Sequence, residues 1–293
     1  MTKIGHNGWL QVNIEAKDPN NLMKPLEFTT SHGSLMELPF KDAADYTAQL
    51  ISKKYDNIHL LLSGGLDSEF VAHTLIKNDI PFKPVILVFK NSLSESWYAF
   101  KFCDENNITP IVIDLQDYVN ADKFMKTLLQ TALKWNIPPV MGLFPLVIAD
   151  MYPDAHILNG FGEVFRTSPV YQNQEHDDIL DLSFNQHSVE VVYGDKHPGA
   201  FFTYTPEIVY SSIVEFDYTV NSQVAKSNLY KILQRSKMDI SDFEGCYSDK
   251  MYHLWMKVIN RHKLKETPEH YKYFIKSNYE WLEFLKSTTL SIG

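Results

Sequence analysis

The chain has 293 residues, of which 44% are hydrophobic and 22% are charged, and it carries a formal net charge of −9. This composition is typical of a globular protein with a sizeable core, and it excludes an intrinsically disordered chain or a membrane-spanning one. The negative charge argues against nucleic acid as a partner, because nucleic-acid-binding proteins present a basic face to phosphates. With only Cys103 and Cys246 and no apolar secretory signal near residue 1, we expect a cytoplasmic protein without a disulfide framework.

Residues 1–45 are predicted to form a small β appendage, and residues 46–293 a larger domain. Residues 9–14 alternate apolar and polar side chains, as a half-buried strand does, and residues 26–30 are the expected hairpin partner. Such a segment is typical of an appendage or a dimer arm, so a homodimer is one expected assembly.

From residue 43 onward, apolar runs and helical patterns alternate, which predicts an α/β fold with a mostly parallel sheet and helices on both faces. Strands are expected at residues 58–62, 85–89, 111–113 and 156–158. Helices are expected at residues 43–54, 67–77, 94–105, 121–135 and 145–151. Beyond about residue 198 the pattern is mainly helical, with helices expected at residues 206–214, 223–235, 247–260 and 270–286.

The sequence Ser-Gly-Gly-Leu-Asp-Ser at residues 63–68 lies where the first buried strand ends and a helix begins. Such a junction binds anions, because free backbone N–H groups and the positive end of the helix dipole point toward it. Gly64 and Gly65 allow the backbone to approach phosphate oxygens closely, and Ser63 and Ser68 add hydroxyl donors. We therefore expect a phosphate-binding loop here.

Asp67 lies beside the expected polyanion, and an intervening Mg²⁺ is the simplest reason for a carboxylate there, so we expect Asp67 to be a metal ligand. The alternative interpretation is an ordinary turn with a helix N-cap. The spacing matches neither a Walker loop nor a dinucleotide fingerprint. The adenine of a bound nucleotide is expected at the end of the second strand, at Leu87, Val88 and Phe89.

The loop resembles the SGGxDS loop of the ATP pyrophosphatases, also called the PP-loop or adenine nucleotide α-hydrolase-like superfamily. Its members, which include asparagine synthetase, NAD synthetase and several tRNA-modifying enzymes, cleave ATP between the α- and β-phosphates and adenylate a substrate. The superfamily also includes thiolating enzymes, which need paired reactive cysteines, and a deazaguanine nitrile synthase, which needs four zinc-binding cysteines. This chain supplies neither set.

Residues 157–166 are similar to a second motif of the asparagine synthetase domain, Leu-Ser-Gly-Glu-Gly-x-Asp-Glu-x-Phe. That motif carries a catalytic glutamate and a metal-binding aspartate. One register places Phe161 at the glutamate position and leaves Glu163 as the only carboxylate, whereas another gives Glu163 the catalytic place. The resemblance implies that Glu163 is catalytic or a metal ligand and that Gly160 contacts the nucleotide. A glycine-rich turn is the alternative.

The family also has a late lysine that neutralises charge on the adenylate and the pyrophosphate by electrostatic stabilisation. Lys250 is the candidate for this role and Lys237 the second choice, with a solvated surface lysine as the alternative. Arg166 follows the second motif and is expected to bind a substrate carboxylate through its planar guanidinium group, or else to form a surface salt bridge.

The resemblance implies an ATP-dependent, AMP-forming ligase, with ATP and Mg²⁺, that activates a small carboxylate or carbonyl oxygen for attack by ammonia or an amine. Asparagine synthetase carries an N-terminal glutaminase with a cysteine nucleophile, whereas this chain has threonine at position 2 and no cysteine before Cys103. The expected partner is therefore a small-molecule substrate, and the nucleophile is expected to be free ammonia, an amine substrate, an intramolecular group, or ammonia from a separate ammonia-supplying subunit. A catalytically reduced nucleotide-binding protein and a tRNA-modifying adenylating enzyme stay open as alternatives.

Overall fold

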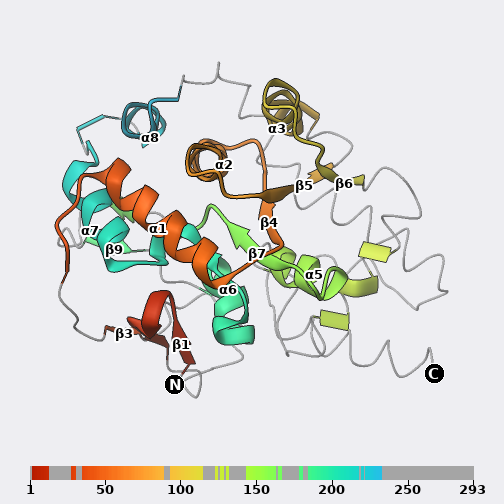
Figure 1. Ribbon diagram of the computed structural model, residues 1–293, viewed down its shortest axis with the longest axis horizontal. Coiled ribbons are helices and arrows are strands. Elements are labelled where there is room, and N and C mark those ends of the chain that lie inside the picture. The colour runs from red at the N-terminus through yellow and green to blue at the C-terminus, as the bar shows by residue number, and fades with distance from the viewer. Residues whose placement is uncertain are drawn as a thin grey trace, which may run out of the picture.

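A five-stranded parallel sheet forms the centre of the computed structural model, with the strand order β10-β7-β4-β5-β6 (Figure 1). Its strands are β4 (Ile58–Leu61), β5 (Phe82–Val88), β6 (Ile111–Asp114), β7 (His156–Asn159) and β10 (Gly199–Ala200). The structure describes residues 2–12, 28–30, 35–88, 93–114, 123–124, 126–128, 130–131, 143–162, 164–166, 178–180, 184–217, 219–220 and 222–232. All four strand pairings in this sheet are parallel, which confirms the predicted α/β class.

Helices cover both faces of the sheet, as expected. They are α1 (Phe40–Lys54), α2 (Leu66–Lys77), α3 (Leu93–Glu105), α5 (Phe144–Met151), α6 (Phe184–Tyr193), α7 (Pro206–Glu215) and α8 (Ser222–Tyr230). Ile58 and Leu60 of β4 pack in one apolar core with residues of α1, α2 and α3. His59 points to the opposite face because side chains alternate along a strand, and its ring contacts Tyr152 at the end of α5.

Several predicted elements differ from the observed ones at their ends. α1 begins at Phe40 and so crosses the boundary drawn at residue 45, and the division into two domains stays a prediction. α8 ends at Tyr230 because Lys231 adopts a φ of 58°, which is outside helical geometry. The helix expected at 121–135 is described only in part, with residues 123–124, 126–128 and 130–131 helical. The helices expected at residues 247–260 and 270–286 lie outside the described residues.

The N-terminal segment forms a three-stranded antiparallel sheet of β1 (Thr2–Ile4), β2 (Leu10–Val12) and β3 (Phe28–Thr30). The β2–β3 pairing confirms the predicted hairpin, whereas β1 is an additional strand. The sheet is anchored on the main body by the indole N–H of Trp9, which donates to the carbonyl oxygens of Thr203 at 3.0 Å and of Tyr204 at 3.2 Å. None of the described helices is long and apolar enough to cross a membrane.

One helix and three further short strands were absent from the predictions. The helix is α6, which is irregular because His187 within it has non-helical torsion angles. β10 has only two residues, which is too short for hydrophobic periodicity to reveal. A small antiparallel pair joins β8 (Val164–Arg166), which forms the end of the second motif, to β9 (Asp178–Leu180).

Candidate functional site

The loop at residues 63–68 lies at the carboxyl end of β4, the middle strand of the sheet, and leads directly into α2. This edge of an open parallel sheet is where α/β proteins bind ligands. Gly64 has a φ of 90°, which other residues adopt only with strain. Ser63 accepts a hydrogen bond from the Gly65 N–H at 3.2 Å, and the hydroxyl of Ser68 donates to the Gly65 carbonyl at 3.2 Å. The loop is therefore held in shape by its own side chains.

The ends of β4 and β7 approach each other so closely that only glycine fits at one position. A Cβ atom on Gly160, which directly follows β7, would lie 2.8 Å from the backbone nitrogen of Ser68 and 3.0 Å from its Cα. These neighbours are backbone atoms of the first turn of α2, so they do not move aside easily. The structure thus brings together Gly160 and Ser68, two residues that the sequence placed at the same site.

Asp67 is engaged by two residues of α8. The Tyr230 hydroxyl donates to Asp67 Oδ1 at 2.7 Å, and the Lys226 ammonium group lies 3.0 Å from Asp67 Oδ2. Lys226 is 4% exposed, which is rare for a lysine and is explained here by its ion pair with Asp67. The contact brings a buried positive charge to the N-terminal turn of α2, where the loop is expected to receive phosphates.

Neither Lys226 nor Tyr230 was predicted as a site residue. The available signal was their spacing of one helical turn within a segment expected to be helical, which places both on the same face. The sequence does not reveal that this face meets Asp67, which is more than 150 positions away along the chain.

The Tyr230 ring is held in a stack of four aromatic rings from distant parts of the chain. Its centroid lies 4.5 Å from that of Phe70 in α2, and 5.8 Å from those of both Phe40 in α1 and Phe202. The interplanar angles of these three pairs lie between 20° and 22°, so the rings are nearly parallel. This packing fixes α8 against α2 and sets the position of the Tyr230 hydroxyl.

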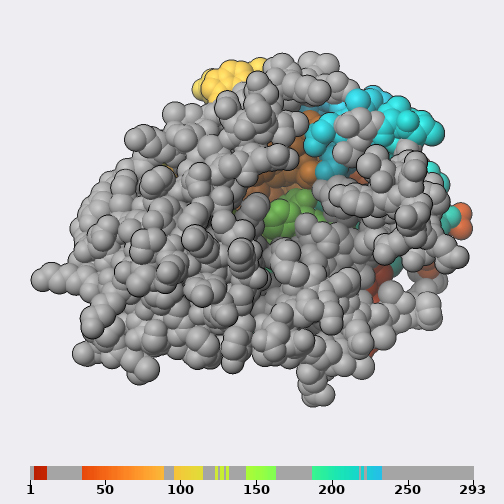
Figure 2. All heavy atoms as spheres, turned by 180° about the vertical axis from the view of Figure 1, so that it is seen from behind, coloured from red at the N-terminus to blue at the C-terminus, as the bar shows by residue number. Residues whose placement is uncertain are grey.

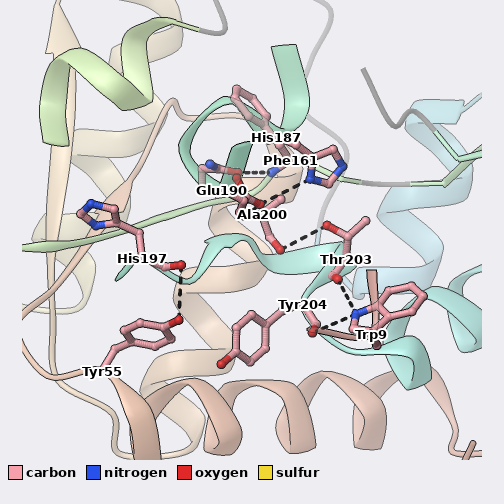
Figure 3. A network of polar contacts seen from close by, with 10 residues as sticks. Trp9, Tyr55, Phe161, His187, Glu190, His197, Ala200, Thr203 and Tyr204 are labelled. Atoms are coloured by element: carbon pink, nitrogen blue, oxygen red, sulfur yellow. Dashed lines mark hydrogen bonds and ion pairs between the residues drawn. The ribbon is translucent and has the colours of Figure 1, made fainter. Parts of the chain in front are cut away.

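The second loop, residues 160–162, is tied to the segment that follows β10 (Figure 3). The Asn159 side chain accepts a hydrogen bond from the Phe161 N–H at 3.0 Å, and the Phe161 carbonyl accepts one from the Phe202 N–H at 3.3 Å. Gly162 has a φ of 86°. Phe161 is therefore fixed on both sides by hydrogen bonds to its backbone.

Glu190 of α6 is a buried carboxylate beside this loop that the sequence did not single out. It is 3% exposed, and its Oε1 accepts a hydrogen bond from the Ala200 N–H at 2.6 Å (Figure 3). The Nδ1 atom of His187, which is fully buried, lies 3.4 Å from the same oxygen. Glu190 thus supports the short strand β10, which pairs with β7 just before Gly160.

The remaining predicted site residues are only partly covered by the described chain. Leu87 and Val88 lie at the end of β5, the strand beside β4, and the Val88 side chain belongs to the apolar core. That adenine binds at this strand end stays a prediction. Arg166 lies in β8 with its Cα opposite that of Asp178, and its side chain is not described. Phe89, Glu163, Lys237 and Lys250 lie outside the described residues.

The donor set suits a nucleotide-bound metal better than a metal held by protein side chains alone. Within the described ranges there is no group of three or more His, Cys, Asp or Glu residues that could hold a metal ion. Mg²⁺ in phosphate-binding enzymes commonly uses one or two carboxylates together with phosphate oxygens and water. Asp67 supplies one such carboxylate, and the Lys226 ammonium group lies where a metal at Oδ2 would compete with it.

Figure 2 shows these elements from behind: the segment around α2, in brown, lies next to the segment around β7, in green, and the last described residues, in cyan and blue, lie beside α2.

A scan against protein-family models found no matching family, and a search of curated proteins found no match. Among solved structures, the chain is similar to an NH3-dependent NAD synthetase from Campylobacter jejuni, with 14% identity and a TM-score of 0.33 over 85% of this chain and 96% of that one. An NMN synthetase from Francisella tularensis has 15% identity and a TM-score of 0.31, over 79% of this chain and 99% of that one.

A glutamine-dependent NAD+ synthetase from Acinetobacter baumannii, in complex with ADP, has 13% identity and a TM-score of 0.34, over 84% of this chain and 47% of that one. NAD synthetases belong to the superfamily that the 63–68 loop resembles. TM-scores at this level are too low to carry an argument about function, which must rest on the residues of the chain itself.

Proposed function

We propose that the chain binds ATP with Mg²⁺ at residues 63–68 and cleaves it to AMP and pyrophosphate while it activates a small carboxylate or carbonyl oxygen. The observation that carries this proposal is the backbone contact between Gly160 and Ser68 at the carboxyl edge of the sheet. It joins the phosphate-binding loop to the second motif, and Lys226 adds a buried positive charge at the same place.

The triphosphate would lie over the N-terminal turn of α2. The backbone N–H groups at the start of that helix and the hydroxyls of Ser63 and Ser68 would donate to phosphate oxygens, and the helix dipole favours negative charge there. Mg²⁺ would be held by phosphate oxygens and Asp67, where it would neutralise charge on the leaving group. Lys226 would then pair with a phosphate oxygen, because the metal would replace its ion pair with Asp67.

The proposed chemical step is the one that the resemblance of the loop implies, attack on the α-phosphate. An oxygen of the substrate attacks the α-phosphorus, the bond to the bridging oxygen of the β-phosphate breaks, and pyrophosphate leaves with the electron pair. Negative charge grows on the pyrophosphate, and the helix N-terminus and Lys226 stabilise it electrostatically. An amine or ammonia then attacks the activated carbon, AMP leaves, and the nitrogen loses a proton.

The test is a product assay with labelled ATP, Mg²⁺, ammonium and a panel of small carboxylates. We expect AMP and pyrophosphate in equal amounts, dependent on one of the carboxylates. ADP and orthophosphate as the products would overturn the proposal, because they come from attack at the γ-phosphate.

A nucleotide-binding protein without turnover is the second candidate, because Phe161 occupies the glutamate position in one register of the second motif and is fixed there by hydrogen bonds on both sides. Exchange of Glu163 for glutamine separates the two candidates. If Glu163 is a general base or metal ligand, Glu163→Gln lowers turnover by about 10²–10⁴-fold with little change in ATP affinity. ATP binding without pyrophosphate release, in wild type and variant alike, would select the second candidate.

A further inference from the structure

We propose that Tyr230 is a positioning residue for Asp67: its hydroxyl fixes Oδ1, so that Oδ2 is the oxygen presented to a cation. This inference rests on the proposed function, since the cation of interest is the Mg²⁺ that accompanies ATP. Nothing in the resemblance to asparagine synthetase suggested a tyrosine for this task.

The two oxygens of Asp67 have different partners in different directions. Tyr230 donates to Oδ1 at 2.7 Å and Lys226 lies 3.0 Å from Oδ2. A carboxylate with a single partner can rotate about its Cβ–Cγ bond, whereas one whose Oδ1 accepts a hydrogen bond from a fixed hydroxyl is held in one plane. Tyr230 therefore determines the plane in which the second oxygen faces the loop.

The hydroxyl is fixed because the ring that carries it belongs to the core. Tyr230 is 6% exposed and is stacked on Phe70, a residue of the same helix as Asp67. Phe40 of α1 is stacked on both rings, at 5.1 Å from Phe70 and 5.8 Å from Tyr230. A movement of the Tyr230 hydroxyl would require this stack to repack, so the hydrogen bond to Oδ1 is preorganised.

Lys226 and Tyr230 have different roles in this arrangement. A lysine side chain is long and flexible, and its ammonium group can leave Oδ2 for a phosphate oxygen when a metal takes its place. The tyrosine hydroxyl stays on Oδ1 in both states. Tyr230 thus lowers the free energy needed to orient Asp67 for the metal. Removal of its hydroxyl should mainly change the dependence of ATP binding on Mg²⁺.

The test is calorimetry of ATP binding over a range of Mg²⁺ concentrations with Tyr230→Phe, which keeps the ring and its stack. We expect the Mg²⁺ concentration that gives half-maximal ATP affinity to rise about tenfold, the factor for one lost hydrogen bond to a charged group. ATP affinity in the presence of a chelator should be unchanged. A residue with a merely structural role would not alter the Mg²⁺ dependence in this selective way.

Tyr204→Phe is the matched control. Tyr204 is 2% exposed and belongs to the same apolar core, and its hydroxyl interacts with the side chain of Tyr55. This variant should keep the Mg²⁺ dependence of the wild type. If Tyr230→Phe also keeps it, or if both variants change it equally, the positioning role is wrong.

A crystal structure of unliganded Tyr230→Phe provides a measure that does not depend on ATP. We expect the Asp67 carboxylate to rotate or to occupy two orientations. In at least one orientation, the distance from Lys226 Nζ to Asp67 Oδ2 should then differ from the 3.0 Å of the wild type. An Asp67 carboxylate unchanged in the variant would overturn the inference. If the wild type fails to bind ATP at any Mg²⁺ concentration, the proposed function fails, and this structural comparison still decides the role of Tyr230.

Discussion

The two ends of the central strands are built from different kinds of residue. At the carboxyl ends of β4 and β7, glycines and serines bring backbone into contact with backbone, and an ion pair lies beside them. At the amino ends, bulky side chains fill the space: Tyr55 donates to the carbonyl oxygens of Asp195 and His197, and its ring contacts that of His156. We propose that the first end binds a ligand, whereas the second contributes to stability.

The largest effect is expected from Gly160→Ala, because this exchange tests the close approach at the carboxyl end. The new Cβ would meet the backbone of Ser68 at 2.8 Å and push the second loop away from α2. A displacement of about 1 Å in an active site typically lowers turnover about 100-fold, and overpacking costs about 1–3 kcal/mol of stability. Pyrophosphate release and urea unfolding measure the two effects.

Gly65→Ala is the comparison for the stability part. Among the described residues a Cβ there would meet the Ser63 hydroxyl alone, at 3.3 Å, and Gly65 has an ordinary φ of −74°. We expect its free energy of unfolding to stay within about 1 kcal/mol of the wild-type value. If the two variants lower the free energy of unfolding equally, the loss in Gly160→Ala does not come from the close contact between Gly160 and Ser68.

The second-largest effect is expected from Asp67→Asn, which changes both metal binding and stability at the carboxyl ends of the strands. Productive binding of ATP with Mg²⁺ should be lost, as the sequence predicted, because the carboxylate is gone. The structure adds a second consequence: the buried Lys226 loses its counter-ion, which we expect to lower stability by about 1–3 kcal/mol, less than for a fully buried pair because Asp67 is partly exposed.

The double variant Asp67→Asn with Lys226→Met distinguishes these two consequences. Methionine fills the space of the lysine stem without a charge, so stability should return toward that of the wild type while ATP binding stays independent of Mg²⁺. Recovery of Mg²⁺-dependent ATP binding in the double variant would contradict the metal role of Asp67.

The loops at the carboxyl ends of β4 and β7 were predicted from the sequence better than α8 and β10, the elements that pack beside them. A buried apolar strand that ends in Ser63 and two glycines has few physical alternatives, since the backbone must turn sharply to begin the next helix. Lys226 could not be found in this way, because its role depends on how α8 packs against α2 through the aromatic stack. β10 was missed for a related reason, because a two-residue strand depends on its pairing with β7 rather than on a pattern of its own.

The smallest effect concerns the amino end and involves the buried imidazole of His197. This residue is 2% exposed, its Nδ1 accepts a hydrogen bond from the Ile157 N–H at 3.2 Å, and burial, helped by the charges of Lys196 and His156, lowers its pKa to about 4. The unfolded chain has the ordinary value of 6.5 and therefore binds more protons between pH 6.5 and about 4.

The contribution of His197 to stability is thus complete above pH 6.5 and is lost progressively as the pH falls toward 4. The shift corresponds to at most about 3 kcal/mol.

Burial also lowers the pKa of His59, so more than one histidine contributes to the pH dependence of wild-type stability. The difference between wild type and His197→Asn isolates the contribution of His197. Asparagine keeps an acceptor for the Ile157 N–H but does not titrate. Urea unfolding between about pH 7 and pH 5 should show a flatter profile for the variant, with ATP affinity unchanged because the exchange lies at the opposite end of the strands. Parallel profiles for the two proteins would show that the pKa of His197 is not lowered in the folded chain, and a change in ATP affinity would show that the two ends of the sheet are coupled.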